Sequence, residues 1–291
     1  MNRRLTLDIL GEAVEIVGPE PDLARVRRQW ERCLTDAPAA RTVELLTWLD
    51  ADTRESTLAS GLSLLGIQLN DDRLNLHAAG LSDAAGRVVA LVAESGTGKT
   101  TAAWVLGRQL GYVSDECVSV DPDTLAVLPF PKPLSLVTTD DAPKRQWGPD
   151  DLGLRHPPAS LGLASIVLLD RTAAPGEARL EPVALIDAVQ SLVLQTSSTA
   201  RMTAPLAALA RLVNRTGGCL RLRYHDIADA ADLLVAHLAH PEPRAEELTH
   251  LPLPDGDAIV VGDQVLALIG DRVVRGAGAQ ELSRRDGRRP D

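Results

Sequence analysis

The residues best suited to chemistry lie in a loop that contains two glycines, residues 93–100, with the sequence Ala-Glu-Ser-Gly-Thr-Gly-Lys-Thr. An apolar run with the length and β-branched content of a buried strand, residues 88–92, precedes this loop. A segment whose apolar residues have helical spacing, residues 101–110, follows it. A strand, a glycine loop that ends in Gly-Lys-Thr and a helix together predict a phosphate-binding P-loop.

Each part of the loop has a role in such a site. Gly96 and Gly98 let backbone N–H groups turn inward as an anion nest, and the helix N-terminus adds partial positive charge. Lys99 is expected to be exposed and to reach the β- and γ-phosphates, and the Thr100 hydroxyl is expected to bind Mg²⁺. The alternative is a surface glycine turn before a helix. The predicted nucleotide site is the whole loop: Ala93, Glu94, Ser95, Gly96, Thr97, Gly98, Lys99 and Thr100.

Two adjacent acids, Asp115 and Glu116, follow the next predicted strand, and Asp115 comes 16 residues after Lys99. Phosphoryl transfer needs an acid that positions Mg²⁺ and, where a hydroxyl attacks, a carboxylate that accepts its proton. Two acids at a strand end can divide these tasks, and the alternative is an ordinary polar β-turn. The chain has no Asn-Lys-x-Asp pattern of GTPases, which weakens a GTPase hypothesis.

Three further features carry candidate side chains. His77 lies in a predicted strand that begins at Leu74, and a histidine there is either structural or part of the site. Lys132, one of only three lysines, stands between two prolines in an extended segment. It is suited to contact a phosphate or an acceptor, and the alternative is a solvated lysine in a rigid loop. Only His237 and His240 have metal-ligand spacing on a helix face, and we expect no metal site there.

The composition excludes several classes of protein. The formal net charge of −10 argues against nucleic acid or an anionic membrane as the main partner. Aromatic residues make up only 2%, so the core must be aliphatic. The three cysteines lie far apart, as is typical of reduced thiols in the cytoplasm. No signal-peptide pattern and no apolar run of transmembrane length occur, so we expect a cytoplasmic protein.

The order of the elements predicts an α/β fold: a P-loop nucleotide-binding core with a mixed sheet, an α+β N-terminal lead-in and a small C-terminal β-meander. Within the core, a polar stretch, residues 138–158, is expected to be a long loop. The expected domains are the lead-in packed on the core (1–72), the P-loop core (73–240), a proline-rich linker (241–256), the β-meander (257–275) and a disordered tail (276–291).

The motifs resemble one family. His77, the loop at residues 93–100 and Ser-Asp-Glu at 114–116 come in the order and near-spacing of the HPr serine kinases, in the P-loop branch shared with ATP-type phosphoenolpyruvate carboxykinase. The chain is more similar to the HPr-kinase-related proteins of bacterial gene clusters, in which Gly-Tyr-Val-Ser-Asp-Glu and Pro-Phe-Pro-Lys-Pro-Leu-Ser look like a recurrent pair. The resemblance covers residues 74–137 well and residues 164–240 more faintly.

The resemblance implies a role for each matching residue. Lys99 and Thr100 match the phosphate and magnesium ligands, and Asp115 matches the first acid, a further magnesium ligand. Glu116 matches the second acid, which takes the acceptor's proton, and His77 matches the histidine that tunes this acid. The usual second acid is Asp, so Glu116 is longer. The family's later glutamate-containing loop is not recognisable, so phosphorolysis and HPr as acceptor do not follow from the resemblance.

The sequence therefore predicts an HPr kinase-like phosphotransferase that uses ATP and Mg²⁺. The acceptor is expected to be a hydroxyl, a serine of a peptide or protein or a small metabolite, with no nucleic acid or membrane partner, and a homo-oligomer is left open. Two alternatives from other classes stand beside it. One is a non-catalytic nucleotide-binding regulatory module, and the other is a P-loop hydrolase that drives a partner with ATP.

Overall fold

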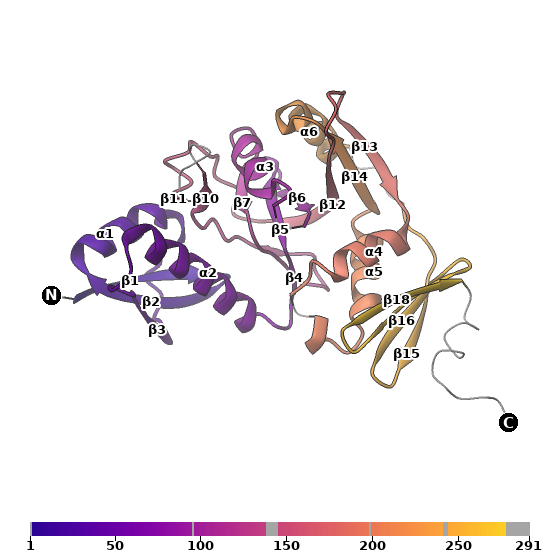
Figure 1. The fold of residues 1–291 in the computed structure, drawn as a ribbon, viewed down its shortest axis with the longest axis horizontal. Coiled ribbons are helices and arrows are strands. Elements are labelled where there is room, and N and C mark those ends of the chain that lie inside the picture. The colour runs from indigo at the N-terminus through magenta and orange to yellow at the C-terminus, as the bar shows by residue number, and fades with distance from the viewer. Residues whose placement is uncertain (1, 95, 138–144, 198, 241–243, 278–291) are drawn as a thin grey trace.

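The computed structural model describes residues 2–94, 96–137, 145–197, 199–240 and 244–277. The predictions for Ser95, for most of the tail and for part of the loop at 138–158 lie outside these residues. The protein is a mixed α/β fold with mixed sheets, as predicted. Figure 1 shows the N-terminal elements at one end of an elongated molecule, the largest sheet in the middle and a C-terminal sheet at the other end.

The central sheet determines where the candidate site lies. Its strand order is β13-β14-β12-β6-β5-β7. β6, β12 and β14 are parallel, whereas β5 is antiparallel to both β6 and β7, so β7 points the same way as β6. The bounds are β5 (Ala78–Ser82), β6 (Arg87–Val92), β7 (Gly111–Ser114), β12 (Gly162–Arg171), β13 (Arg179–Val183) and β14 (Cys219–Tyr224). The carboxyl ends of β6, β7, β12 and β14 therefore meet at one edge.

Helices cover both faces of this sheet because its strands are apolar on both sides. Val88, Ala90 and Val92 of β6 pack with α4 (Leu185–Val193) and α5 (Pro205–Arg215). The alternate residues, Val89 and Leu91, pack with α3 (Lys99–Leu106) and α6 (Ala231–Ala239). Two short 3₁₀ turns, η2 (Thr199–Arg201) and η3 (Ile227–Ala230), precede α5 and α6. The loop at residues 93–100 thus follows directly on a strand whose residues from Val88 to Val92 are all buried.

The N-terminal region has its own core. It consists of β1 (Asn2–Ile9), β2 (Glu12–Pro19), α1 (Glu20–Gln29), η1 (Glu31–Cys33), β3 (Arg41–Glu44) and α2 (Ala51–Leu69). Its apolar cluster continues into the rest of the chain through Cys117 and Phe130. The rings of Trp30 and Phe130 have centroids 6.2 Å apart. The segments that carry the candidate acids and Lys132 are therefore anchored in the N-terminal core.

The chain changes sheets at His77, where a single predicted strand is in fact two. β4 (Leu74–Leu76) pairs with β8 (Val118–Val120), which pairs with β9 (Val127–Leu128), while β5 joins the central sheet. The His77 N–H donates to the carbonyl of Gln195 at 2.7 Å instead of to a strand. This separation places His77 at the same edge as the carboxyl ends of β6 and β7.

Two segments predicted as irregular carry strands. β11 (Arg145–Trp147) lies in the predicted long loop and pairs with β10 (Leu134–Leu136). β15 (Thr249–Leu253) lies in the predicted linker and forms a four-stranded sheet with β16 (Gly256–Val261), β17 (Gln264–Ile269) and β18 (Arg272–Ala277). The prolines there do not prevent pairing, because β15 is an edge strand.

The C-terminal sheet is packed on the main core through Ile259, Leu266 and Leu268. The three cysteines are free and buried, and burial raises the pKa of Cys117 and Cys219 to about 12. Among the described helices, none combines the length and apolar character needed to cross a membrane.

Candidate functional site

The glycine loop has the backbone that its sequence predicts. Gly96 has a φ of 84° and Gly98 a φ of 101°, values in the left-handed region that favours glycine. Gly98 is the N-cap of α3, and its carbonyl accepts the Ala102 N–H at 2.8 Å. The Tyr224 hydroxyl donates to the Thr97 carbonyl at 3.5 Å, which ties the loop to the end of β14. The loop therefore ends at a helix N-terminus, where an anion is stabilised.

Lys99 is buried, with 7% of its surface exposed, where the sequence predicts an exposed lysine. Its ammonium group donates to the carbonyls of Ala93 at 2.5 Å and Glu94 at 3.0 Å, so the side chain folds back under the loop. Burial lowers the pKa of Lys99, and the charges of Asp115 and Glu116 oppose this shift. The lysine is thus within electrostatic range of both acids.

The two acids have different surroundings. The Asp115 side chain is 4% exposed and the Glu116 side chain 35% exposed. The Lys132 ammonium group lies 3.1 Å from Asp115 Oδ1 and 3.1 Å from Glu116 Oε2. The Ser63 hydroxyl, which belongs to α2, lies 3.0 Å from the same Glu116 oxygen. Asp115 is therefore an interior group, while Glu116 lies partly at the surface.

Tyr112 joins Asp115 to the Lys132 backbone. Its hydroxyl lies 3.3 Å from Asp115 Oδ1 and 3.0 Å from the Lys132 carbonyl oxygen, two acceptors that it can serve in turn. Burial, and next the charge of Asp115, raise the pKa of Tyr112 well above its usual value. The phenol therefore stays protonated and remains a donor to the carboxylate.

His77 lies near the same groups. Burial lowers its pKa, and the positive charge of Lys99 lowers it further. The charge of Glu116, a hydrogen bond with the Glu116 backbone and the charge of Asp115 oppose this shift. The imidazole is therefore mostly neutral at neutral pH, a state in which it can accept or donate a hydrogen bond.

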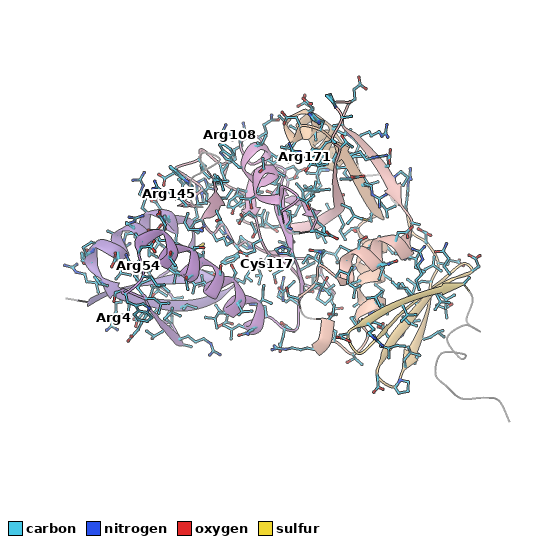
Figure 2. The ribbon with its side chains drawn as sticks, viewed as in Figure 1. Arg4, Arg54, Arg108, Cys117, Arg145 and Arg171 are labelled. Carbon is cyan, nitrogen blue, oxygen red and sulfur yellow. The ribbon has the colours of Figure 1, made fainter. Side chains whose placement is uncertain are left out.

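The structure thus brings His77, Lys99, Asp115 and Glu116 into one electrostatic cluster at the edge where β6 and β7 end. Cys117, the next residue, lies between the N-terminal elements and the central sheet (Figure 2). The two histidines with metal spacing are not part of the cluster. His237 Nε2 lies 2.8 Å from the Ser165 hydroxyl on β12 instead.

Sequence reasoning missed two residues that contact the acid pair, Ser63 and Tyr112, and left the role of Lys132 open. Ser63 lies in the middle of a long helix, and no local signal marks it as a partner of Glu116. Tyr112 stands in a buried strand, where a core role is the simplest interpretation. For Lys132, the sequence is consistent both with contact to a phosphate or an acceptor and with a solvated side chain. The small number of lysines and the two prolines beside Lys132 mark this residue as a candidate. Neither feature indicates that its side chain is buried against the two acids.

A cleft of about 660 Å³ borders the loop on the side of β12 and β14. β12 and β14 lie on one side of β6, and β5 and β7 on the other. The cleft is lined by Glu94 and Thr97 of the loop, Asp170 of β12, Gln190 of α4, Arg221 of β14 and Arg275 of β18. Its size and mixed polar and apolar lining suit a small organic ligand.

Hard oxygen donors are present for magnesium. In the part of the chain that the structure describes, no group of three or more His, Cys, Asp and Glu side chains could hold a metal ion by itself. Magnesium at phosphate sites needs fewer protein ligands, since one or two carboxylates and the phosphates complete its shell. The Thr100 hydroxyl in the first turn of α3 and the Asp115 carboxylate are donors of this kind. The donor chemistry therefore fits magnesium held together with a nucleotide.

No protein-family model matches the chain, and no curated protein matches it. Among solved structures, the HPr(Ser) kinase/phosphatase from Coxiella burnetii is similar over 57% of this chain and 93% of that chain, with 11% identity and a TM-score of 0.28. A likeness of this extent says nothing about activity.

Proposed function

We propose that the protein is an ATP-dependent kinase that transfers the γ-phosphoryl group to a hydroxyl, of a serine in a peptide or protein or of a small metabolite. The observation that carries the proposal is that the glycine loop, the acid pair and His77 lie at one edge of the central sheet, where β6 and β7 end and β5 begins. These residues are far apart in sequence. They lie close together in the fold because β6 and β7 run in the same direction and end at the same edge of the sheet. Phosphoryl transfer depends mainly on such positioning and on charge.

The loop would hold the phosphates. Backbone N–H groups around Gly96 and Gly98 and the first turn of α3 are suited to an anion, and Lys99 adds a full positive charge. Thr100 and Asp115 would hold magnesium, which when bound supplies charge neutralisation to the phosphates. Because Lys99 also stands near Asp115 and Glu116, the loop and the acids can act on the same phosphoryl group.

Asp115 and Glu116 differ in solvent exposure, and this difference suits them to different roles. Asp115, almost fully buried and fixed by Lys132 and Tyr112, is the better metal ligand. Glu116, with 35% of its side chain exposed, can meet an acceptor hydroxyl that arrives from solvent and take its proton. Neutral His77 beside the Glu116 backbone can orient this carboxylate.

The cleft provides a place for the nucleoside. It opens from the loop toward β12, β14 and α4, whereas the acids lie toward β7. A nucleotide whose phosphates follow the loop would therefore have its nucleoside in the cleft and its terminal phosphate toward Glu116. The acceptor would approach from the β7 side.

A non-catalytic nucleotide-binding regulator is the second candidate. The observation that favours it is that both acids are ion-paired with Lys132, as in a structural cluster. The two functions differ in one result, since only the kinase moves phosphate to an acceptor.

The experiment is transfer from γ-labelled ATP to free serine, free threonine and serine-containing peptides, with ATP affinity measured by calorimetry. Glu116→Gln should slow transfer by about 10²-fold or more because base catalysis is lost, and should leave ATP affinity unchanged. Glu12→Gln, an exposed change on β2, is the matched control and should keep wild-type transfer. ATP binding without transfer to any acceptor would support the regulator instead.

A further inference from the structure

Lys132 is a buried charged group beside the site, with 4% of its side chain exposed, the same fraction as its partner Asp115. Besides its two ion pairs, its ammonium group donates to the Pro133 carbonyl at 3.1 Å. A buried ammonium group without partners would be unstable, and two adjacent carboxylates without a cation would repel each other. The three charges therefore stabilise one another as a unit.

The backbone fixes where this cation lies. The Phe130 N–H donates to the Val113 carbonyl of β7 at 3.0 Å, and the Lys132 N–H donates to the Phe130 carbonyl at 2.8 Å. The Tyr112 hydroxyl reaches the Lys132 carbonyl from the same strand. The Lys132 backbone is thus tied to the end of β7, which is also where the acids begin.

Ser63 adds a second fixed contact to the same carboxylate oxygen. The serine is buried, and its hydroxyl lies 3.0 Å from both the Ala59 carbonyl and Glu116 Oε2. Since one hydroxyl has one proton, it can donate to Glu116 only when it leaves the helix carbonyl. Glu116 Oε2 therefore has two neighbours, the Lys132 ammonium group and the Ser63 hydroxyl of the N-terminal region.

We propose that Lys132 is the internal counter-cation of the Asp115–Glu116 pair and, together with Ser63, positions the Glu116 carboxylate for the acceptor. The counter-cation role stands on the contacts alone. The positioning role rests on the proposed kinase function. Neither residue has to touch substrate, so both are positioning residues rather than catalytic ones.

A stability cycle tests the counter-cation. Lys132→Met should lower the unfolding midpoint by about 10 °C, because it leaves two carboxylates without their cation. In the background of Asp115→Asn with Glu116→Gln, the same change should cost less than half as much. If Lys132→Met alone is insoluble, recovery of folded protein in the triple variant supports the role. An equal loss in both backgrounds would show that the lysine acts only by packing and would overturn it.

A kinetic comparison tests the positioning role. Ser63→Ala should lower kcat about 10-fold with an unchanged Kd for ATP, since only the orientation of Glu116 changes. Thr57→Ala removes a hydroxyl that bonds a helix carbonyl on the same helix in the same way, and it should have wild-type kcat. Lys132→Arg, which keeps the charge, should retain more kcat than Lys132→Met.

The two experiments fail separately. A Ser63→Ala kcat equal to that of Thr57→Ala overturns the positioning role in a working kinase. A wild type that transfers no phosphate overturns the proposed function and the positioning role together, while the stability cycle still decides whether Lys132 is the counter-cation.

Discussion

The Asp257 carboxylate of the C-terminal sheet accepts the backbone N–H of Ala207, in the first turn of α5, at 3.0 Å. The carboxylate also accepts the Leu206 N–H at 3.3 Å, and Asp257 is fully buried. The N-cap of α5, Ala204, makes no side-chain cap hydrogen bond. A residue far along the chain therefore caps the helix that packs on the central sheet, and this contact joins the C-terminal sheet to the core.

We expect Asp257→Ala to lower the free energy of unfolding by about 2 kcal/mol, the upper range for loss of a helix cap, because two buried N–H groups lose their acceptor. Urea unfolding measures the change. Asp255→Ala, in the exposed turn before the same strand, is the matched control and should change stability by less than about 0.5 kcal/mol. Equal stability of the two variants would show that the cap contributes nothing.

The backbone of the loop gives a second prediction. Gly98→Ala places a Cβ at a φ of 101°, so the loop must distort and ATP affinity should fall at least 10-fold in calorimetry. Gly61→Ala on α2 is the opposite case, because the new Cβ meets nothing within 4 Å. That variant should gain about 0.5–1 kcal/mol of stability and keep wild-type affinity. Undiminished ATP binding by Gly98→Ala would contradict the phosphate role of the loop.

Acid pH should loosen the contact between the N-terminal region and the core. The buried Arg32 side chain donates to Asp150 at 2.7 Å, and this hydrogen bond lowers the pKa of Asp150. The unfolded chain then binds more protons than the folded one between the lowered pKa and 3.8. The contribution of the pair is therefore complete above pH 3.8 and is lost as the pH falls through the lowered pKa.

The measurement is urea unfolding between pH 3 and pH 6. Asp150→Asn should reduce stability at pH 6 and should flatten its decline toward low pH. Arg32→Met should also flatten the decline, because the largest cause of the lowered Asp150 pKa is removed and only the smaller effect of His156 remains. A decline as steep as that of the wild type in both variants would refute this assignment.

Local patterns predicted much of the fold. The apolar run of β6, the glycine turn and the helix after it could be predicted because none of them needs a distant partner. The break at His77 could not be predicted, because Leu74, Leu76 and Ala78 form one continuous pattern. The segment is divided because β4 pairs with β8 whereas β5 pairs with β6. A pattern within residues 74–82 cannot show which strands will be these partners.

The same limit applies to the site. The loop and the acids could be found because their spacing has a chemical meaning. The burial of Lys99 and Lys132 could not, since a lysine is mostly exposed unless a partner is supplied. The partners of Lys132 are the two acids, and those of Lys99 are the carbonyls of Ala93 and Glu94. Only the folded structure therefore shows that both lysines are buried.

Arg275 gives a prediction that separates the two ends of the nucleotide site. Its guanidinium group, on β18, donates to Asp187 and, at 3.2 Å, to Gln190, both on α4, and it lines the cleft beside the loop. If the nucleoside lies there, Arg275→Met should weaken ATP binding about 10-fold. The nucleoside would lose its contacts with the guanidinium group, and the cleft would lose the hydrogen bonds that join β18 to α4. Tripolyphosphate, which has no nucleoside, should bind as it does to the wild type because the loop is unchanged. Arg272→Met, an exposed change on the same strand, is the matched control and should affect neither ligand. Calorimetry with both ligands decides the matter, and an equal loss for ATP and tripolyphosphate would place the phosphates, rather than the nucleoside, next to Arg275.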